Sequence, residues 1–184
     1  MIDTNDFLCV LKHARCEAGL EESIDIQAIK LDDNDGLAIA IGFHPAMVCK
    51  ADYFMHLGET IKFIELSDLE ESAVKCHEIL QRLIKKKQEE LGLDELPTRL
   101  MRPLRKKAWL ELTREFKNKW GGSIAVIERL LRRNNIQYDP TYRLIIVCKN
   151  KTEVNILDDL KCQLQGMMGN VEVCNTNTVA RYMR

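Results

Sequence analysis

Residues 142–175 constrain the fold of this chain more than any other segment. Residues 142–148 (YRLIIVC) form a short, mostly apolar run, which is typical of a buried strand. Residues 153–168 then repeat apolar side chains at helical spacing, and residues 171–175 (VEVCN) form a second short run. This order predicts a β-α-β unit with parallel strands, because the helix must return the chain to the same end of the sheet. Helices and strands are therefore expected to alternate here within one domain.

The first third of the chain predicts the rest of a small sheet. Residues 23–31 and 37–43 alternate apolar and polar side chains on either side of an acidic turn that ends in glycine, which predicts an antiparallel hairpin. Residues 60–66 (TIKFIEL) predict a third strand in this region. Residues 3–19 repeat apolar side chains at helical spacing and are expected to form a helix. A short helix is also expected within residues 46–58.

The middle of the chain begins with an expected long helix over residues 67–91. Ser67 and Glu70 match a capping box, in which each side chain can bond the backbone amide of the other residue. Gly92 is suited to end this helix, since glycine adopts the left-handed conformation that many helix ends require.

A pair of basic helices is expected next. Residues 103–120 predict the first helix, which the two glycines at 121–122 are expected to end. Residues 123–133 predict the second, which Asn134 can end. Residues 99–119 contain eight bases and only two acids. The pair can therefore present a strongly basic surface.

These elements together predict a single α+β domain spanning residues 1–184. We expect a small mixed sheet, formed by the N-terminal antiparallel hairpin and the C-terminal β-α-β unit, covered by the long helix and by the basic helical pair. The domain divides into an acidic part (residues 1–66), a helical and basic part (residues 67–135) and a β-α-β part (residues 136–184).

The charge of the chain is unevenly distributed, although its net value is only −1. Residues 1–72 carry 15 acids and 5 bases, whereas residues 73–135 carry 8 acids and 16 bases. This asymmetry predicts an anionic partner, and the first hypothesis is a non-enzymatic accessory protein that binds nucleic acid. Tyr138 or Tyr142 could add stacking on unpaired bases. The candidate phosphate-binding residues lie on both basic helices: Arg102, Arg105, Lys106, Lys107, Lys117, Arg132 and Arg133.

Two other interpretations of the basic helices stay open. Their basic face can simply be solvated, or it can be neutralised by the acidic first third of the same chain. The second hypothesis for function is a protein-interaction module, such as an inhibitor or adaptor, that docks a partner protein. Trp109, Phe116 and Trp120 are its candidate interface residues, either for that partner or for a homodimer, since large aromatic side chains anchor many interfaces.

No established catalytic motif occurs in the sequence. It lacks a Gly-rich phosphate loop, a G-x-S-x-G elbow and an H-E-x-x-H pair, so a non-enzymatic function without a cofactor is favoured. A divalent-metal nuclease is the third hypothesis. It would need acids near strand ends and a nearby lysine. Asp52, Glu59 and Glu65 are available as acids, and Lys149 and Lys151 as lysines.

The cysteines and histidines provide one candidate metal site. Cys9, His13 and Cys16 would lie on one face of the expected N-terminal helix and could bind zinc, but their spacing matches no known finger or ribbon. We therefore expect no bound metal. The seven cysteines are odd in number and widely spaced, which favours free thiols in a reducing compartment. With no apolar run of membrane-spanning length and no basic start of a secretory signal, the protein is expected to be cytoplasmic.

Overall fold

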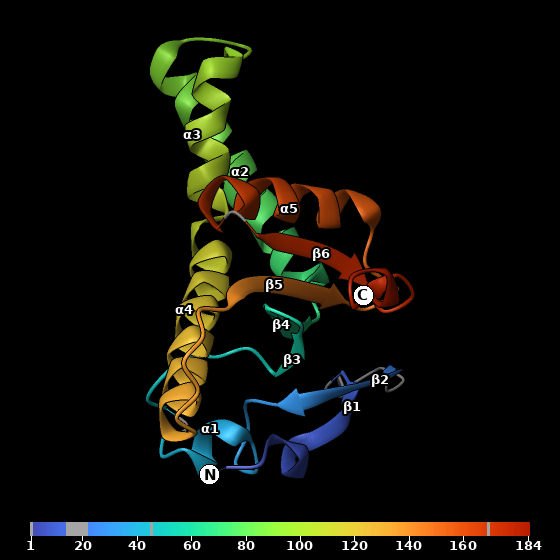
Figure 1. The fold of residues 1–184 in the computed structure, drawn as a ribbon. Helices are drawn as coiled ribbons and strands as arrows, with labels where there is room; N and C mark the ends of the chain where they lie inside the picture. The colour runs from blue at the N-terminus through green and yellow to red at the C-terminus, as the bar shows by residue number, and fades with distance from the viewer. Residues whose placement is uncertain (1, 14–21, 45, 169) are drawn as a thin grey trace.

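A mixed sheet forms the centre of the protein (Figure 1). The structure is a computed structural model and describes residues 2–13, 22–44, 46–168 and 170–184, and within these ranges the sheet has six strands in chain order. Neighbouring strands from β1 to β4 are antiparallel, and β4, β5 and β6 are parallel. The strands are β1 (Leu8–Lys12), β2 (Ser23–Lys30), β3 (Tyr53–Leu57), β4 (Thr60–Ser67), β5 (Thr141–Cys148) and β6 (Val171–Asn175).

The helices connect these strands and cover the sheet. Along the chain, the long helices α2 and α4 and the shorter α3 come between β4 and β5, and α5 connects β5 to β6. The ends of α2 and α3 extend beyond the sheet as a helical projection, and α4 runs along the side of the sheet (Figure 1). The helices are α1 (Leu37–Ala40), α2 (Glu70–Leu91), α3 (Thr98–Ala108), α4 (Leu110–Arg133) and α5 (Val154–Met168), with short 3₁₀ turns η1 (Thr4–Phe7) and η2 (Val179–Arg181).

The hydrophobic core lies on both faces of the sheet. Side chains alternate between faces along a strand, so Ile145 and Val147 of β5 pack on the face opposite to Ile146. The larger cluster lies between the sheet and the helices, where Leu160 of α5 and Phe116 of α4 are buried. The predicted α+β class and the C-terminal β-α-β unit are confirmed.

The N-terminal helix predicted over residues 3–19 is wrong. The chain instead forms the turn η1 and the edge strand β1, which pairs antiparallel with β2. A short apolar run such as residues 7–11 fits helix and strand periodicities equally well, and pairing with β2 decides the outcome. Residues 14–21 lie outside the described part of the chain.

The predicted hairpin between residues 23–31 and 37–43 is only half right. Residues 23–30 form β2, but β2 pairs with β1 and β3. Residues 37–40 form the short helix α1, where Leu37 and Ala38 are fully buried. The short helix expected within residues 46–58 is also wrong, because this segment contains β3.

The helix boundaries of the middle region agree with the prediction only in part. The capping box is absent, because Ser67 is the last residue of β4 and Glu70 pairs with Lys151 at 2.9 Å. Gly92 ends α2 with φ 63°, as predicted. The expected pair over residues 103–120 and 123–133 is instead divided at Trp109, into α3 and α4.

The two glycines at 121–122 do not end a helix, because α4 continues through them. Gly122 is needed for close packing, since a Cβ atom there would lie 1.8 Å from the carbonyl oxygen of Cys49. The glycine therefore lets the segment before β3 lie directly on α4. Gly121 has no such neighbour, and a Cβ atom there would meet nothing within 4 Å.

Candidate active site

Glu65 occupies a buried position on β4. The alternation along this strand points Ile61, Phe63 and Glu65 toward the helices, so a carboxylate lies where its neighbours place apolar side chains. The side chain of Glu65 is only 3% exposed. One oxygen, Oε1, forms an ion pair with the Nζ atom of Lys119 on α4. The other, Oε2, is buried without a hydrogen-bond partner among the described residues.

Asp52 lies beside Glu65, immediately before β3. Its Oδ2 atom accepts a hydrogen bond of 2.7 Å from the backbone N–H of Leu66, the residue after Glu65 on β4. Its backbone carbonyl accepts hydrogen bonds from the amides of Leu31 and Asp32, at 2.8 Å and 3.2 Å. The backbone and the carboxylate of Asp52 are thus both fixed by the sheet.

A hydrogen-bonded clamp on α4 brings the third member, Lys119, to the two carboxylates. The hydroxyl of Ser123 donates a hydrogen bond of 2.7 Å to the carbonyl of Lys119 and accepts one of 2.9 Å from the amide of Ala51. Ala51 precedes Asp52, so Ser123 links the Asp52 segment to the helical turn that carries Lys119. The close packing of Gly122 on Cys49 strengthens the same contact.

The electrostatics of this cluster are strongly perturbed. Burial raises the pKa of Glu65 above its ordinary value, and the nearby Asp52 carboxylate raises it further, against the opposing effect of Lys119. Burial also raises the pKa of Asp52, although the Leu66 amide and Lys119 oppose this shift. Burial alone would lower the pKa of Lys119, but the surrounding carboxylates outweigh it and raise the pKa.

The cluster contains one positive charge too few for its two carboxylates. Lys119 can balance one ionised carboxylate, and the raised pKa values of Glu65 and Asp52 favour retention of a proton by the pair. A bound cation would replace that proton and supply a partner for the unpaired Oε2 atom of Glu65. A cation held by Asp52 and Glu65 would therefore complete the charge balance of the cluster.

The donor set fits magnesium or manganese better than zinc. Within the described residues, no group of three or more His, Cys, Asp or Glu side chains is placed to hold a metal ion. Mg²⁺ is commonly bound by one or two carboxylates, with water and substrate phosphates as the remaining ligands. On the α4 side of the cluster, the side chain of Lys119 is 21% exposed and that of its other partner, Glu115, is 55% exposed.

Three of the seven predicted phosphate-binding residues line one groove. Arg102, Arg105 and Lys106 of α3 face Cys162 and Gln163 of α5 across a groove of about 450 Å³. Among the residues that the structure describes, none of the three bases forms an ion pair. No described acid of the first third of the chain therefore neutralises this part of the basic surface.

The other predicted phosphate-binding residues lie elsewhere. Lys107 is exposed on α3 outside the groove, and Lys117 is exposed on α4. Arg132 and Arg133 are exposed in the last turn of α4, about 40 Å from Arg105 at 1.5 Å per residue. The seven residues therefore do not form one continuous surface.

The predicted interface residues belong mainly to the core. Trp109 and Phe116 are 2% and 1% exposed, and Trp120 is partly exposed and packs edge-on against Phe63. This placement favours the interpretation that the helices of the same chain cover the aromatic stripe. Association of the protein with a copy of itself or with another protein stays a prediction.

The predicted zinc ligands are not arranged on one helical face. Cys9 belongs to β1, His13 is buried just after it, and Cys16 lies outside the described residues. The thiols of the other described cysteines are free, as is that of Cys9. Of the other residues considered for a nuclease, Glu59 is exposed in the β3–β4 turn, and Lys149 pairs with Asp68 at 3.2 Å.

Sequence reasoning identified both carboxylates but missed Lys119 and the relation among the three residues. Comparisons with known proteins identify no relative: no family model, no curated protein and no solved structure matches this chain. In the described part of the chain, no helix has the length and apolar character needed to cross a membrane.

Proposed function

We propose that the protein is a divalent-metal-dependent nuclease that hydrolyses phosphodiester bonds at the centre formed by Asp52, Glu65 and Lys119. The observation that carries the proposal is the unpaired, buried Oε2 atom of Glu65, which lies in a cluster that lacks one positive charge. Buried carboxylates destabilise a fold unless they are paired, and perturbed groups of this kind concentrate at functional sites.

Each residue of the centre has a distinct role in this proposal. Asp52 and Glu65 would hold a magnesium or manganese ion, and such an ion would supply Lewis-acid chemistry and a water of lowered pKa. Lys119 stabilises the negative charge that develops on the phosphate. Its ion pair with Glu65 and the Ser123 clamp keep the ammonium group in place.

The basic groove on α3 supports nucleic acid as the substrate. Hydrogen bonds continue through the division between α3 and α4, from the amide of Trp109 to Arg105 and from that of Thr113 to Trp109. Lys119 therefore lies about 20 Å along the helices from Arg105, at 1.5 Å per residue. A polynucleotide could span this distance, with some phosphates in the groove and one at the centre.

Cleavage of labelled nucleic acid tests the proposal. Single- and double-stranded DNA and RNA are incubated with the protein in Mg²⁺, in Mn²⁺ or in EDTA, and the products are separated by gel electrophoresis. We expect cleavage that requires the metal. Asp52→Asn, Glu65→Gln and Lys119→Met should each lower the rate about 100-fold or more, since each removes several kcal/mol of charge stabilisation.

Glu59→Gln is the matched control, because Glu59 is an exposed acid outside the cluster. Its activity should equal that of the unmodified protein. Equal cleavage by the Glu65→Gln protein would reveal a contaminating nuclease and contradict the proposal. Binding of nucleic acid without metal-dependent cleavage of any substrate would instead favour the second candidate function, a non-enzymatic nucleic-acid-binding protein, for which the α3 groove is the supporting observation.

A further inference from the structure

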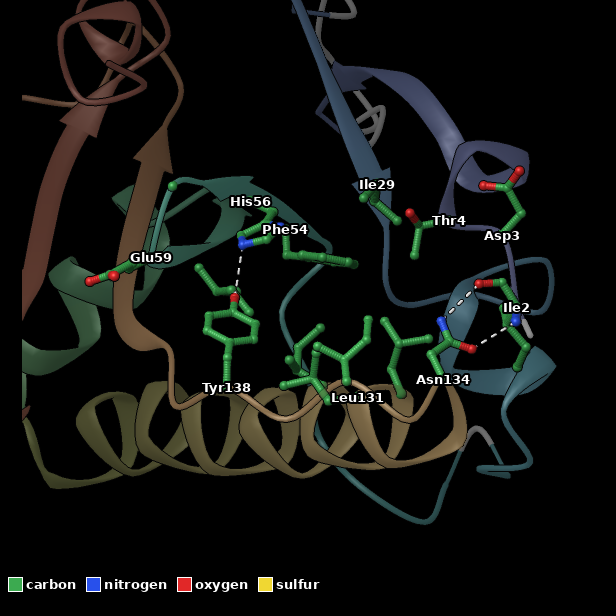
Figure 2. A pocket seen from close by; sticks show the side chains of 15 residues that line it. Ile2, Asp3, Thr4, Ile29, Phe54, His56, Glu59, Leu131, Asn134 and Tyr138 are labelled. Atoms are coloured by element: carbon green, nitrogen blue, oxygen red, sulfur yellow. Dashed lines mark hydrogen bonds between the residues drawn. The ribbon is translucent and has the colours of Figure 1, made fainter.

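An apolar pocket lies between the sheet and the C-terminal half of α4, away from the carboxylate centre (Figure 2). Its volume is about 610 Å³, within the range of pockets that take small ligands. Ile61 of β4 lines it, whereas Glu65 lies four residues further along the same strand, about 13 Å away at 3.3 Å per residue. The apolar lining comes from β2, β3, β4 and α4 and includes Ile29, Phe54, Ile61, Ile127, Leu130 and Leu131.

The two ends of the pocket carry different polar groups. At one end, the hydroxyl of Tyr138 and the Nε2 atom of His56 are hydrogen-bonded at 2.8 Å (Figure 2). At the other, the amide of Ile2 donates to the Oδ1 atom of Asn134 at 2.8 Å, and the side-chain amide of Asn134 donates back to the carbonyl of Ile2 at 3.0 Å. The side-chain amide of Asn134 therefore holds the N-terminal segment. The His56–Tyr138 pair is the polar group that can hydrogen-bond a ligand.

The charged residues around the pocket exclude one class of ligand. The described residues that line it include two acids, Asp3 and Glu59, and no lysine or arginine. An anionic ligand would lose its hydration in an apolar site and gain no cationic partner there, which is strongly unfavourable. An uncharged molecule would bury its apolar body without this loss.

We infer that this pocket is a binding site for a small, uncharged and largely apolar molecule whose one polar group reaches His56 and Tyr138. The apolar lining provides the burial that drives binding, and the polar pair at one end orients the ligand. This site is separate from the carboxylate centre, so the inference does not depend on the nuclease proposal.

Two fluorescent probes with the same aromatic body test the inference. Phenylnaphthylamine is uncharged, and anilinonaphthalene sulfonate adds one negative charge to the same ring system. Each is titrated into the protein, and fluorescence gives affinity and stoichiometry. We expect saturable binding of one phenylnaphthylamine per chain. It should be at least about tenfold tighter than binding of the sulfonate, because the negative charge of the sulfonate would be buried without a cationic partner.

Variants locate the binding site. Leu131→Trp and Ile29→Trp each fill the pocket and should weaken phenylnaphthylamine binding at least about tenfold, through lost volume. Ile29 is only partly buried, so its variant keeps the test usable if Leu131→Trp fails to fold. Val154→Trp adds the same side chain at an exposed position of α5 and should leave binding unchanged. Glu59→Lys supplies a cation and should reduce the difference in affinity between the two probes.

Several results would overturn the inference. The first is the absence of saturable phenylnaphthylamine binding. The second is equal affinity for the two probes, which would indicate adsorption to any apolar surface. The third is unchanged binding by both filling variants, which would place the probe elsewhere on the protein.

Discussion

Glu65 lies among apolar side chains on the helical face of β4, and the burial of an ionised carboxylate there lowers the stability of the folded protein. Its raised pKa means that the folded protein binds more protons than the unfolded chain in the interval between the two pKa values. The free energy of unfolding therefore falls as the pH rises from the unfolded-state value of about 4.3 through the raised folded-state value. Asp52, whose pKa is also raised, contributes in the same direction.

Replacement of Glu65 by glutamine should stabilise the metal-free protein at alkaline pH. The amide cannot ionise, so it avoids the burial of a second negative charge. We expect a gain of about 1–3 kcal/mol over the unmodified protein above pH 8, and a smaller difference near pH 5. Urea unfolding at several pH values measures both, and Glu115→Gln, at an exposed acid that also contacts Lys119, is the control.

In the presence of divalent cations, the unmodified protein should become more stable than the Glu65→Gln protein. On the proposal above, Mg²⁺ or Mn²⁺ should bind the folded form of the unmodified protein and raise its midpoint of thermal unfolding, by the linkage between ligand binding and stability. The Glu65→Gln protein should respond much less. If the midpoint of the unmodified protein does not depend on the cation, Asp52 and Glu65 do not form a metal site.

The residues of this centre differ in how far the sequence could reveal them. Asp52 and Glu65 stand out as acids near an expected strand, but they are 13 positions apart and form no motif. Lys119 lies 54 positions beyond Glu65, on a helix with many other bases. Only the packing of α4 on β4 selects it, and a single sequence contains no signal for that contact.

Elements are best predicted where local pattern and tertiary context agree. The β-α-β unit was predicted correctly because β5 is buried on both faces and α5 has a regular apolar row. β1 was mistaken for a helix because its five residues become a strand only through pairing with β2. The two glycines of α4 were read as a helix end, whereas close packing explains why Gly122 is there.

The two glycines make a matched test of that packing. Gly121→Ala should stabilise the protein by about 0.5–1 kcal/mol, since alanine is the better helix former and nothing lies within 4 Å of the new atom. Gly122→Ala should destabilise it by roughly 1–3 kcal/mol, because the new methyl group collides with the backbone at Cys49. Urea unfolding of the two variants measures the difference.

Displacement at Gly122 should also affect the proposed catalytic centre. The Cys49 segment leads directly to Ala51, which Ser123 holds, and then to Asp52. A shift of this segment would move Asp52 relative to Lys119, so the rate of cleavage should fall in Gly122→Ala and not in Gly121→Ala. Two variants of equal stability would contradict the role assigned to Gly122.

At the scale of the whole molecule, α3 followed by α4 forms one helical column (Figure 1). The α3 residues of the basic groove and Lys119 of the carboxylate centre both belong to this column. The uneven charge of the sequence predicted a basic helical surface, but it could not distinguish bases that share a groove from those that are dispersed. Arg102, Arg105 and Lys106 share the groove with α5, whereas Lys107, Lys117 and Arg132 lie outside it. The charge count is the same for both sets.

Replacing all three bases of either set by glutamate gives two triple variants with the same change in net charge. If the groove holds phosphates, replacement of Arg102, Arg105 and Lys106 by glutamate should weaken binding of single-stranded nucleic acid. It should also reduce the slope of log affinity against log salt by roughly 2, since each lost phosphate contact removes about 0.7. Replacement of Lys107, Lys117 and Arg132 by glutamate should reduce the slope by much less, because these side chains are dispersed. Fluorescence anisotropy at several salt concentrations, in EDTA to prevent cleavage, measures both slopes. Equal slopes for the two variants would mean that net charge alone attracts nucleic acid and that the groove is not its binding site.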